Sequence, residues 1–181
     1  MTECTWAQSS PAMQQYHDTE WGKPEHDSQK LFGLLCLETF QAGLSWQTVL
    51  NKRAAFEQDF QNFEPHHVAQ MTATDVERLM QDPAIIRNRR KIEAAITNAQ
   101  AVLQLEADGG FGQYLWSFVD DQPLINHPQT DTEVPATSAL SERVSKALKQ
   151  QGFKFVGPTI IYSFLQGAGL INDHVDGCPF K

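Results

Sequence analysis

Hydrophobic residues lie on nearly every side of residues 31–50, and this pattern predicts a buried helix rather than a surface helix. Glu38 lies in the middle of this stretch, where a carboxylate among apolar residues is costly unless something binds it. Gly43 can end the helix and Ser45 can cap the next one. Glu38 and Trp46 therefore flank a sharp break. The break predicts either the wall of a pocket or a partly exposed carboxylate that bonds to neighbouring backbone.

The rest of the chain shows signals of further helices joined by short connections. Helices are expected from Ser45 through Phe56, from Pro65, from a capping box at residues 74–77, along the stripe Ile92, Ile96, Ala99 and Leu103, over residues 112–119, from Ser141 to Gln151, and after Gly157. Residues 1–27 and 123–135 have no clear period and are expected to be irregular. No convincing strand alternation appears, so the chain is predicted to be all-α, with about seven to ten helices.

The composition is that of an ordinary globular protein, with 41% hydrophobic and 20% charged residues among 181. This length suits one domain, or two small lobes that share a core. No apolar run could span a bilayer and the N-terminus shows no signal peptide, so we expect a cytoplasmic protein without a membrane partner. The three cysteines are too sparse for a disulfide framework.

The formal net charge of −8 counts against nucleic acid as a partner, although the distribution of charge matters more than its sum. Residues 87–91 and 143–154 are locally basic. In the second segment, Gly152 and Gly157 predict a tight hairpin and Pro158 starts a new helix, a geometry that can bind phosphate through backbone N–H groups. The alternatives are a solvated charge run for the first segment and an ordinary helix corner for the second.

Two cysteines and two histidines lie near the ends of the chain: Cys4, His17, His174 and Cys178. Two sulfurs and two imidazoles suit tetrahedral zinc. Four protein ligands leave no open position, so such an ion would be structural and would join the two terminal segments. Neither pair has the short spacing of a Cys-x-x-Cys motif, so the spacing does not establish the site by itself.

A set of longer motifs follows in order along the chain: Cys4-Thr-Trp6-Ala, Tyr16-His17-Asp18-Thr-Glu20-Trp21-Gly22, Leu37-Glu38, Gln41-Ala-Gly-Leu-Ser-Trp46, Ile85-Ile-Arg-Asn, Gly152-Phe-Lys-Phe-Val-Gly157 and Asn172-Asp-His174. Together they resemble the DNA-3-methyladenine glycosylase I family. The resemblance implies a helix-hairpin-helix glycosylase fold over residues 1–181, either as a single helical domain or as two lobes with a base pocket between them. It also implies one structural Zn²⁺ ion on the two cysteines and two histidines.

The resemblance assigns roles to named residues. It implies that the hairpin grips the DNA backbone with Gly152, Phe153, Lys154, Phe155 and Gly157. It implies that Glu38 and Tyr16 contact the damaged adenine and carry the chemistry, and that Trp46 stacks on the base. Trp6 and Trp21 are expected to shape the same pocket.

The function implied is that of a monofunctional glycosylase acting on double-stranded alkylated DNA. No spare apolar face stands out in the sequence, so a monomer is expected. The glycosylase would flip out 3-methyladenine, hydrolyse its bond to deoxyribose and release the free base, which starts base excision repair. Methylation at N3 already makes the base cationic, so the enzyme need not protonate it. An aromatic wall and a buried carboxylate are the groups that recognise a flat cation. We therefore expect Glu38 to act first in recognition and second in stabilising the sugar cation.

Two further expectations concern residues after the hairpin. Strand-cutting glycosylases carry a lysine there, whereas the comparable position is near Thr159, so simple hydrolysis without a Schiff base is expected. Related glycosylases use an aspartate after the hairpin helix, and the sequence leaves open whether Asp173 assists. The rival functions are a non-catalytic DNA-binding module held by zinc, a zinc hydrolase, and a helical domain that binds a cationic or purine ligand without DNA.

Overall fold

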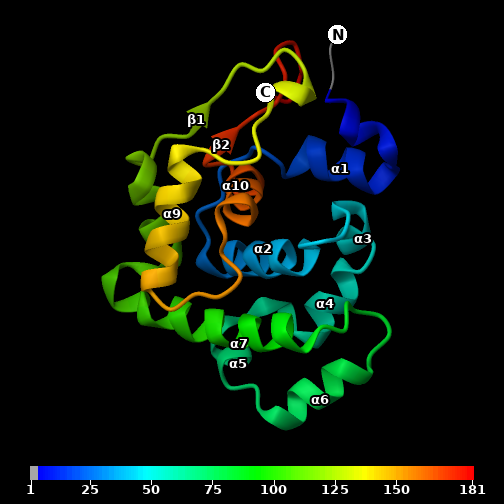
Figure 1. The fold of residues 1–181 in the computed structure, drawn as a ribbon, viewed down its shortest axis with the longest axis vertical. Helices are drawn as coiled ribbons and strands as arrows, with labels where there is room; N and C mark the ends of the chain where they lie inside the picture. The colour runs from blue at the N-terminus through cyan, green and yellow to red at the C-terminus, as the bar shows by residue number, and fades with distance from the viewer. Residues whose placement is uncertain (1–3) are drawn as a thin grey trace.

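The computed structural model describes residues 4–181, which form a mainly helical protein (Figure 1). Its α-helices are α1 (Pro11–Thr19), α2 (Ser28–Gln41), α3 (Trp46–Leu50), α4 (Arg53–Asp59), α5 (Pro65–Ala69), α6 (Ala73–Gln81), α7 (Arg89–Gln104), α8 (Gly110–Trp116), α9 (Ala139–Gln150) and α10 (Pro158–Gly167). Short 3₁₀ turns are Thr5–Ser9, Gln61–Phe63, Glu106–Asp108, Ser117–Val119 and Asp131–Glu133. The expectation of a helical protein is confirmed. Among residues 4–181, every helix is too short or too polar to span a lipid bilayer.

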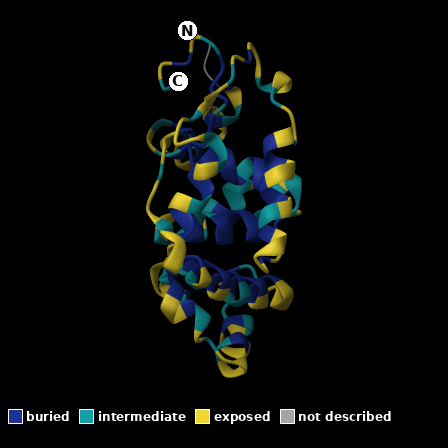
Figure 2. Ribbon diagram, turned by 90° about the vertical axis from the view of Figure 1, so that its left-hand side faces the viewer, coloured by how far each residue is buried: buried dark blue, intermediate teal, exposed yellow. Residues whose placement is uncertain are grey.

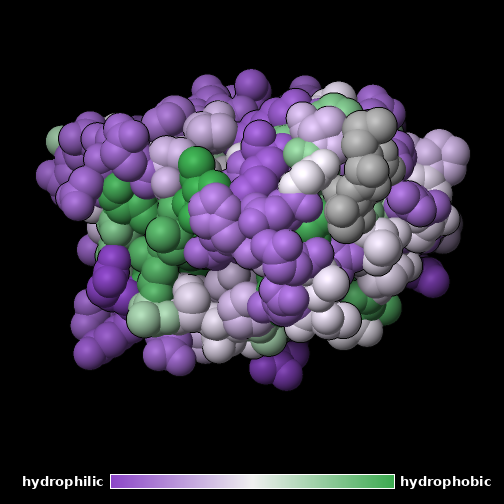
Figure 3. Space-filling model, turned by 90° about the horizontal axis from the view of Figure 1, so that it is seen from above, coloured by the Kyte–Doolittle hydropathy of each residue, from purple (hydrophilic) through white to green (hydrophobic). Residues whose placement is uncertain are grey.

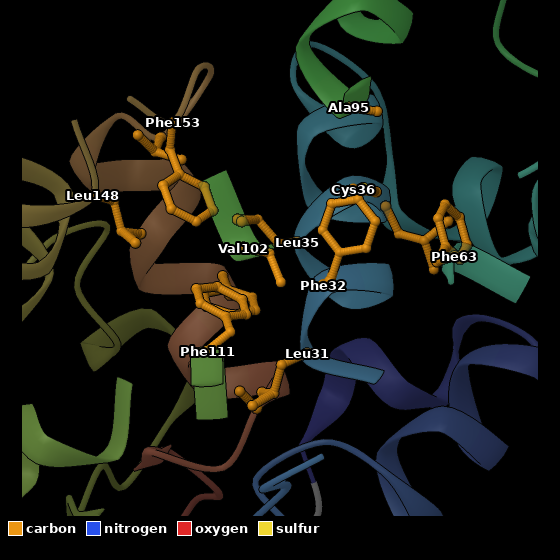
Figure 4. Close-up of a cluster of buried hydrophobic side chains, with 14 of the residues drawn as sticks. Leu31, Phe32, Leu35, Cys36, Phe63, Ala95, Val102, Phe111, Leu148 and Phe153 are labelled. Atoms are coloured by element: carbon orange, nitrogen blue, oxygen red, sulfur yellow. The ribbon is translucent and has the colours of Figure 1, made fainter. Parts of the chain in front are cut away.

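Helix α2 is the centre of the core, as its apolar sequence predicts. Asp27 caps it by accepting a hydrogen bond from the Lys30 amide at 2.9 Å. Figures 1 and 2 show α2 between α10 on one side and α7 on the other, with buried residues gathered where these helices meet. In the close-up of Figure 4, Phe32 and Leu35 of α2 lie between Phe111 and Phe63.

Three local expectations, about the irregular N-terminal segment and about two helix caps, are wrong. Residues 1–27 are not wholly irregular: Ser10 accepts from the Met13 amide at 3.3 Å and Pro11 begins α1, while residues 1–3 lie outside the described part. The capping box of α6 uses Thr72 rather than Thr74, and α9 is capped by Ser138 rather than Ser141. Each region offers several hydroxyl residues, and tertiary packing selects among them.

A second set of differences concerns breaks in the chain. The helix expected from Ser45 to Phe56 is split, because α3 ends at Leu50 and α4 begins at Arg53. Two short parallel strands, β1 (Leu124–Ile125) and β2 (Ile171–Asn172), pair with each other. Two residues are too few for an alternating pattern, so the sequence could not show them.

Leu124 and Ile125 of β1 are 45% and 52% exposed. In Figure 3, hydrophobic residues gather on the left of the face shown, the side on which β1 lies in Figure 1. Most of the remaining surface on that face is hydrophilic.

The basic segment at residues 87–91 is partly used inside the protein. Arg89 pairs with Glu77 at 2.7 Å. Lys91 is only 6% exposed, and its Nζ donates to the carbonyl oxygens of Phe40 and Ala42 at 2.9 and 2.7 Å. Burial lowers the pKa of Lys91. This lysine therefore caps the C-terminal end of α2, where a positive charge is favourable, rather than lying free for an anionic partner.

We expect Lys91→Met to lower the free energy of unfolding by about 2 kcal/mol, because it leaves two carbonyl groups without their donor. Arg87→Met is the matched control, since Arg87 is exposed in the same segment. Urea unfolding at neutral pH measures both. Equal stabilities for the two variants would contradict the capping role.

Candidate active site

Helices α1, α2, α3 and α10 enclose a cavity of about 360 Å³ near the N-terminal segment. We call it the aromatic cavity. It is lined by Trp6, Met13, Tyr16, Trp21, Glu38, Gln41, Trp46, Asp131, Val134, Ser163 and Gln166. The structure thus brings together all five residues expected at a base pocket: Trp6, Tyr16, Trp21, Glu38 and Trp46.

Glu38 supplies a carboxyl group to this cavity. Glu38 is 4% exposed, and no hydrogen bond to its side chain occurs among residues 4–181. Burial raises the pKa of this carboxyl from its usual 4.5 to about 8. A carboxyl that opens into a cavity with no protein partner is poised to receive a ligand donor or cation.

Aromatic rings form the walls around Glu38. The rings of Tyr16 and Trp46 lie 5.2 Å apart at 51°, and those of Trp6 and Trp21 lie 5.0 Å apart at 76°. Burial, and secondarily Glu38, raises the pKa of Tyr16, so its hydroxyl stays protonated and can donate. The indole nitrogen of Trp46 is also buried without a partner among the described residues. The walls therefore combine apolar faces with unused polar atoms.

Close packing behind Tyr16 requires glycine at position 167. A Cβ atom there would lie 2.8 Å from the Tyr16 hydroxyl oxygen. Gly167 is the last residue of α10, so this helix approaches α1 closely enough to hold the tyrosine ring at the cavity.

The four expected zinc ligands form one buried cluster, which we call the Cys/His cluster. The ligand atoms of Cys4, His17, His174 and Cys178 all lie within 4.8 Å of one another. Nδ1 of His174 lies 3.1 Å from Nε2 of His17 and 3.4 Å from Sγ of Cys178. These inward-facing atoms could hold a metal ion between them.

The outer nitrogens of the two imidazoles have partners of their own. His17 Nδ1 lies 2.7 Å from a carboxylate oxygen of Asp18, and His174 Nε2 lies 3.0 Å from the carbonyl oxygen of Trp21. Acceptors at these positions orient the rings and leave the inner nitrogens unprotonated, as metal ligation requires. The donor set and its orientation therefore fit a tetrahedral zinc ion.

The hairpin, residues 151–157, connects α9 to α10. Gly152 has φ +90° and Phe155 has φ +55°. Asn98 of α7, which is fully buried, holds the hairpin from below: its Oδ1 accepts from the Lys154 amide at 2.7 Å, and its Nδ2 donates to the Lys154 carbonyl at 3.1 Å. One side chain thus satisfies both backbone groups of a single hairpin residue.

Some backbone amides of the hairpin already donate hydrogen bonds within the protein, and others do not. Those of Gly152, Phe153 and Lys154 donate to Lys149, Leu148 and Asn98. The amides of Phe155, Gly157 and Thr159 have no acceptor among residues 4–181. Unused donors therefore cluster at the second half of the hairpin and the start of α10, which is the geometry that binds anions.

The family model described as methyladenine glycosylase matches residues 6–181. The chain belongs to this family. Methyladenine glycosylases similar to it include DNA-3-methyladenine glycosylase 1 of Escherichia coli K12, 53% identical over 98% of this chain and 96% of that protein. DNA-3-methyladenine glycosylase of Haemophilus influenzae is 46% identical over 99% of this chain and 98% of that protein.

Solved structures of methyladenine glycosylases are similar as well. The structure that describes 3-methyladenine recognition by 3-methyladenine DNA glycosylase I from Staphylococcus aureus has a TM-score of 0.95 and 44% identity, covering 100% of this chain and 97% of that one. A variant of 3-methyladenine DNA glycosylase I in complex with 3-methyladenine has a TM-score of 0.96 and 43% identity, covering 100% and 98%.

In this methyladenine glycosylase, Asp173 is enclosed rather than open to the cavity. It is 2% exposed, and its carboxylate accepts from Tyr162 Oη at 2.6 Å, Gln166 Nε2 at 2.7 Å and Asn126 Nδ2 at 2.6 Å. All three contacts come from protein side chains. The carboxylate is therefore occupied in a structural network within the described residues.

Sequence reasoning missed six of the cavity residues: Met13, Gln41, Asp131, Val134, Ser163 and Gln166. Met13 and Gln41 lie one turn from Tyr16 and Glu38, so helical periodicity could have found them. Asp131 lies in the long loop after β1 and accepts from the Thr5 amide at 2.7 Å. Nothing in the local sequence of that loop indicates that it reaches the cavity.

Proposed function

We propose that this protein is a monofunctional DNA-3-methyladenine glycosylase, which flips 3-methyladenine out of alkylated double-stranded DNA and hydrolyses its bond to deoxyribose. The observation that carries the proposal is the unpartnered Glu38 carboxyl inside a cavity walled by Tyr16 and Trp46. Membership of the methyladenine glycosylase family and the names of the relatives agree with it. Release of the base would start base excision repair.

The chemistry of the substrate explains why such a cavity suffices. A 3-methyladenine base carries a positive charge while it is attached to deoxyribose, so it leaves as a neutral molecule without a proton donor. The face of Trp46 attracts a flat cation. A cation in the cavity favours the ionised form of Glu38, whose negative charge then attracts it. Tyr16 donates a hydrogen bond from a hydroxyl that remains protonated. Trp6 and Trp21 complete the aromatic lining.

The reaction then needs little further help from the protein. The bond from N9 to C1′ breaks with its electron pair going to N9, and water adds its oxygen to C1′ and releases a proton. The negative charge of Glu38 stabilises the oxocarbenium-like sugar as charge develops on it. Thr159 follows the hairpin where a strand-cutting enzyme would carry an amine, so no Schiff base forms.

The Cys/His cluster would hold one zinc ion. With four protein ligands, the ion would serve as a structural cross-link between the N-terminal segment and the chain after β2. The Trp21 carbonyl oxygen accepts from His174 and Trp21 also lines the aromatic cavity, so the cross-link supports one cavity wall.

DNA binding is assigned to a helix-hairpin-helix element made of α9, the hairpin and α10, in a single-domain monomer. The unused amides of Phe155, Gly157 and Thr159 would contact a backbone phosphate. Gly152, Phe153 and Lys154 would contribute through turn geometry, packing and the lysine charge, because their amides are occupied. Arg90, whose guanidinium lies 5.9 Å from the centre of the Phe155 ring, adds positive charge beside the hairpin.

We expect Asn98→Ala to weaken duplex binding roughly tenfold, because the Lys154 backbone loses both partners and the hairpin loosens. Fluorescence anisotropy with a labelled duplex measures this effect. Binding of free 3-methyladenine, followed by tryptophan fluorescence, should stay unchanged. Thr97→Ala, one residue earlier on α7, is the control. A parallel loss of both binding activities in Asn98→Ala would mean general disruption instead.

Release of free base from methylated duplex DNA tests the proposed function directly, with Glu38→Ala beside the unaltered protein and strand nicking scored in parallel. Release of 3-methyladenine that is impaired in the variant, without nicking, is the expected result. No release by the folded, zinc-loaded protein would instead favour a non-catalytic DNA-binding module.

A further inference from the structure

Gln166 lies between a buried carboxylate and the aromatic cavity. It is the penultimate residue of α10, is 9% exposed and lines the cavity with Glu38 and Ser163. On its other side, its amide nitrogen donates to Asp173 Oδ2 at 2.7 Å. Neither end of the contact takes part in the chemistry described above.

The Asp173 network dictates which way the Gln166 carboxamide faces. Asp173 Oδ2 also accepts from the Tyr162 hydroxyl at 2.6 Å, while Oδ1 accepts from Asn126 Nδ2 at 2.6 Å. A carboxylate that serves three donors can only accept, so Gln166 must present its nitrogen to Asp173. The amide oxygen is therefore the end of the carboxamide that the Asp173 network leaves free, on a residue that lines the aromatic cavity.

A fixed acceptor in this cavity distinguishes between methylated purines. Adenine carries an exocyclic amine at C6, with two hydrogens to donate, and a single carboxylate oxygen of Glu38 accepts only one of them. Guanine carries a carbonyl oxygen at the same position. An acceptor held against that oxygen would leave two buried acceptors facing each other, which is strongly unfavourable.

We propose that Gln166 is a specificity-determining residue of the base pocket, and that Asp173 is the positioning residue that keeps the Gln166 amide oxygen directed into it. The oxygen accepts from the exocyclic amine of flipped 3-methyladenine and opposes the C6 carbonyl of 3-methylguanine. The proposal rests on the proposed glycosylase function.

The test compares the release of two bases from one sample of duplex DNA methylated with dimethyl sulfate, which contains both 3-methyladenine and 3-methylguanine. Single-turnover rates are measured for the unaltered protein, for Gln166→Met and for Tyr162→Phe. Gln166→Met keeps the volume of the side chain and removes the amide. Tyr162→Phe removes another donor to the same Asp173 oxygen from the same helix, but Tyr162 does not line the aromatic cavity.

For Gln166→Met we expect about a tenfold fall in the rate for 3-methyladenine and about a tenfold fall in its preference over 3-methylguanine. Tyr162→Phe should keep the preference. A general loss of folding would slow the release of both bases alike and leave the ratio of the two release rates unchanged. This ratio therefore separates an effect on specificity from an effect on stability.

Two results would overturn the proposal: an unchanged ratio in Gln166→Met, or an equal fall of the ratio in Tyr162→Phe. If circular dichroism finds Gln166→Met unfolded, Gln166→Leu takes its place with the same expected and contrary outcomes. Failure of the unaltered protein to release 3-methyladenine would instead overturn the proposed function, and this assignment with it.

Discussion

Glu38→Gln will remove most of the excision activity and at the same time stabilise the folded protein at pH 8. Activity should fall by about 100-fold, because a cationic base favours the ionised form of Glu38, and the variant cannot supply the negative charge that stabilises the developing sugar cation. The gain in stability has a different cause. Burial raises the pKa of Glu38 from 4.5 to about 8, so the folded protein keeps this proton at pH values where the unfolded chain has already released it.

The sign of the pH effect follows from proton linkage. Between pH 4.5 and about 8 the folded state binds one more proton at Glu38 than the unfolded state, so stability falls as the pH rises. Each pH unit in this range lowers the free energy of unfolding of the unaltered protein by about 1.4 kcal/mol. Glu38→Gln removes this loss, so the variant should be more stable by about 4 kcal/mol at pH 8 and show no such gain below pH 4.5.

Urea unfolding of both proteins at pH 5 and pH 8 measures this difference, and single-turnover release of 3-methyladenine measures activity. Glu93→Gln is the control, because Glu93 is an exposed glutamate on α7 and should change neither quantity. If the difference in stability between the unaltered protein and Glu38→Gln is the same at both pH values, Glu38 does not carry a raised pKa.

Cys178→Ala should abolish zinc binding and lower the free energy of unfolding by about 3–5 kcal/mol, since a metal ion that binds only the folded state contributes its binding free energy to folding. The cluster joins Cys4 and His17 to His174 and Cys178 across more than 150 residues of chain. Its loss should also loosen Trp21, whose carbonyl orients His174.

Cys36→Ala is the matched control for the zinc prediction. Cys36 is 1% exposed and so as buried as the cluster cysteines, but it lies on α2 and does not belong to the Cys/His cluster. Its replacement should cost about 1 kcal/mol and leave the zinc content at one ion per chain. Elemental analysis of desalted protein and urea unfolding with and without chelator give the two quantities. Zinc-free unaltered protein from a zinc-containing culture would rule out the structural ion.

Much of the fold could be predicted because its signals are local. The apolar sequence around Glu38 places α2 in the core, and Gly152, Gly157 and Pro158 mark the hairpin and the start of α10. The first residue of a helix is harder to predict from sequence than the helix itself. Several hydroxyl residues near α6 and α9 could each act as a cap, and the choice between them depends on which turn packs against the core.

Local sequence is enough to predict that the chain is helical, that Glu38 lies within an apolar helix and that two cysteines and two histidines are available near the chain ends. Which polar groups contact one another depends on the tertiary fold. Asn98 reaches Lys154 across 56 positions, Lys91 reaches Phe40 across 51, and Asn126 reaches Asp173 across 47. Such contacts produce no periodic pattern in the sequence. A buried polar group needs a hydrogen-bond partner nearby in space, and that partner can come from any position along the chain.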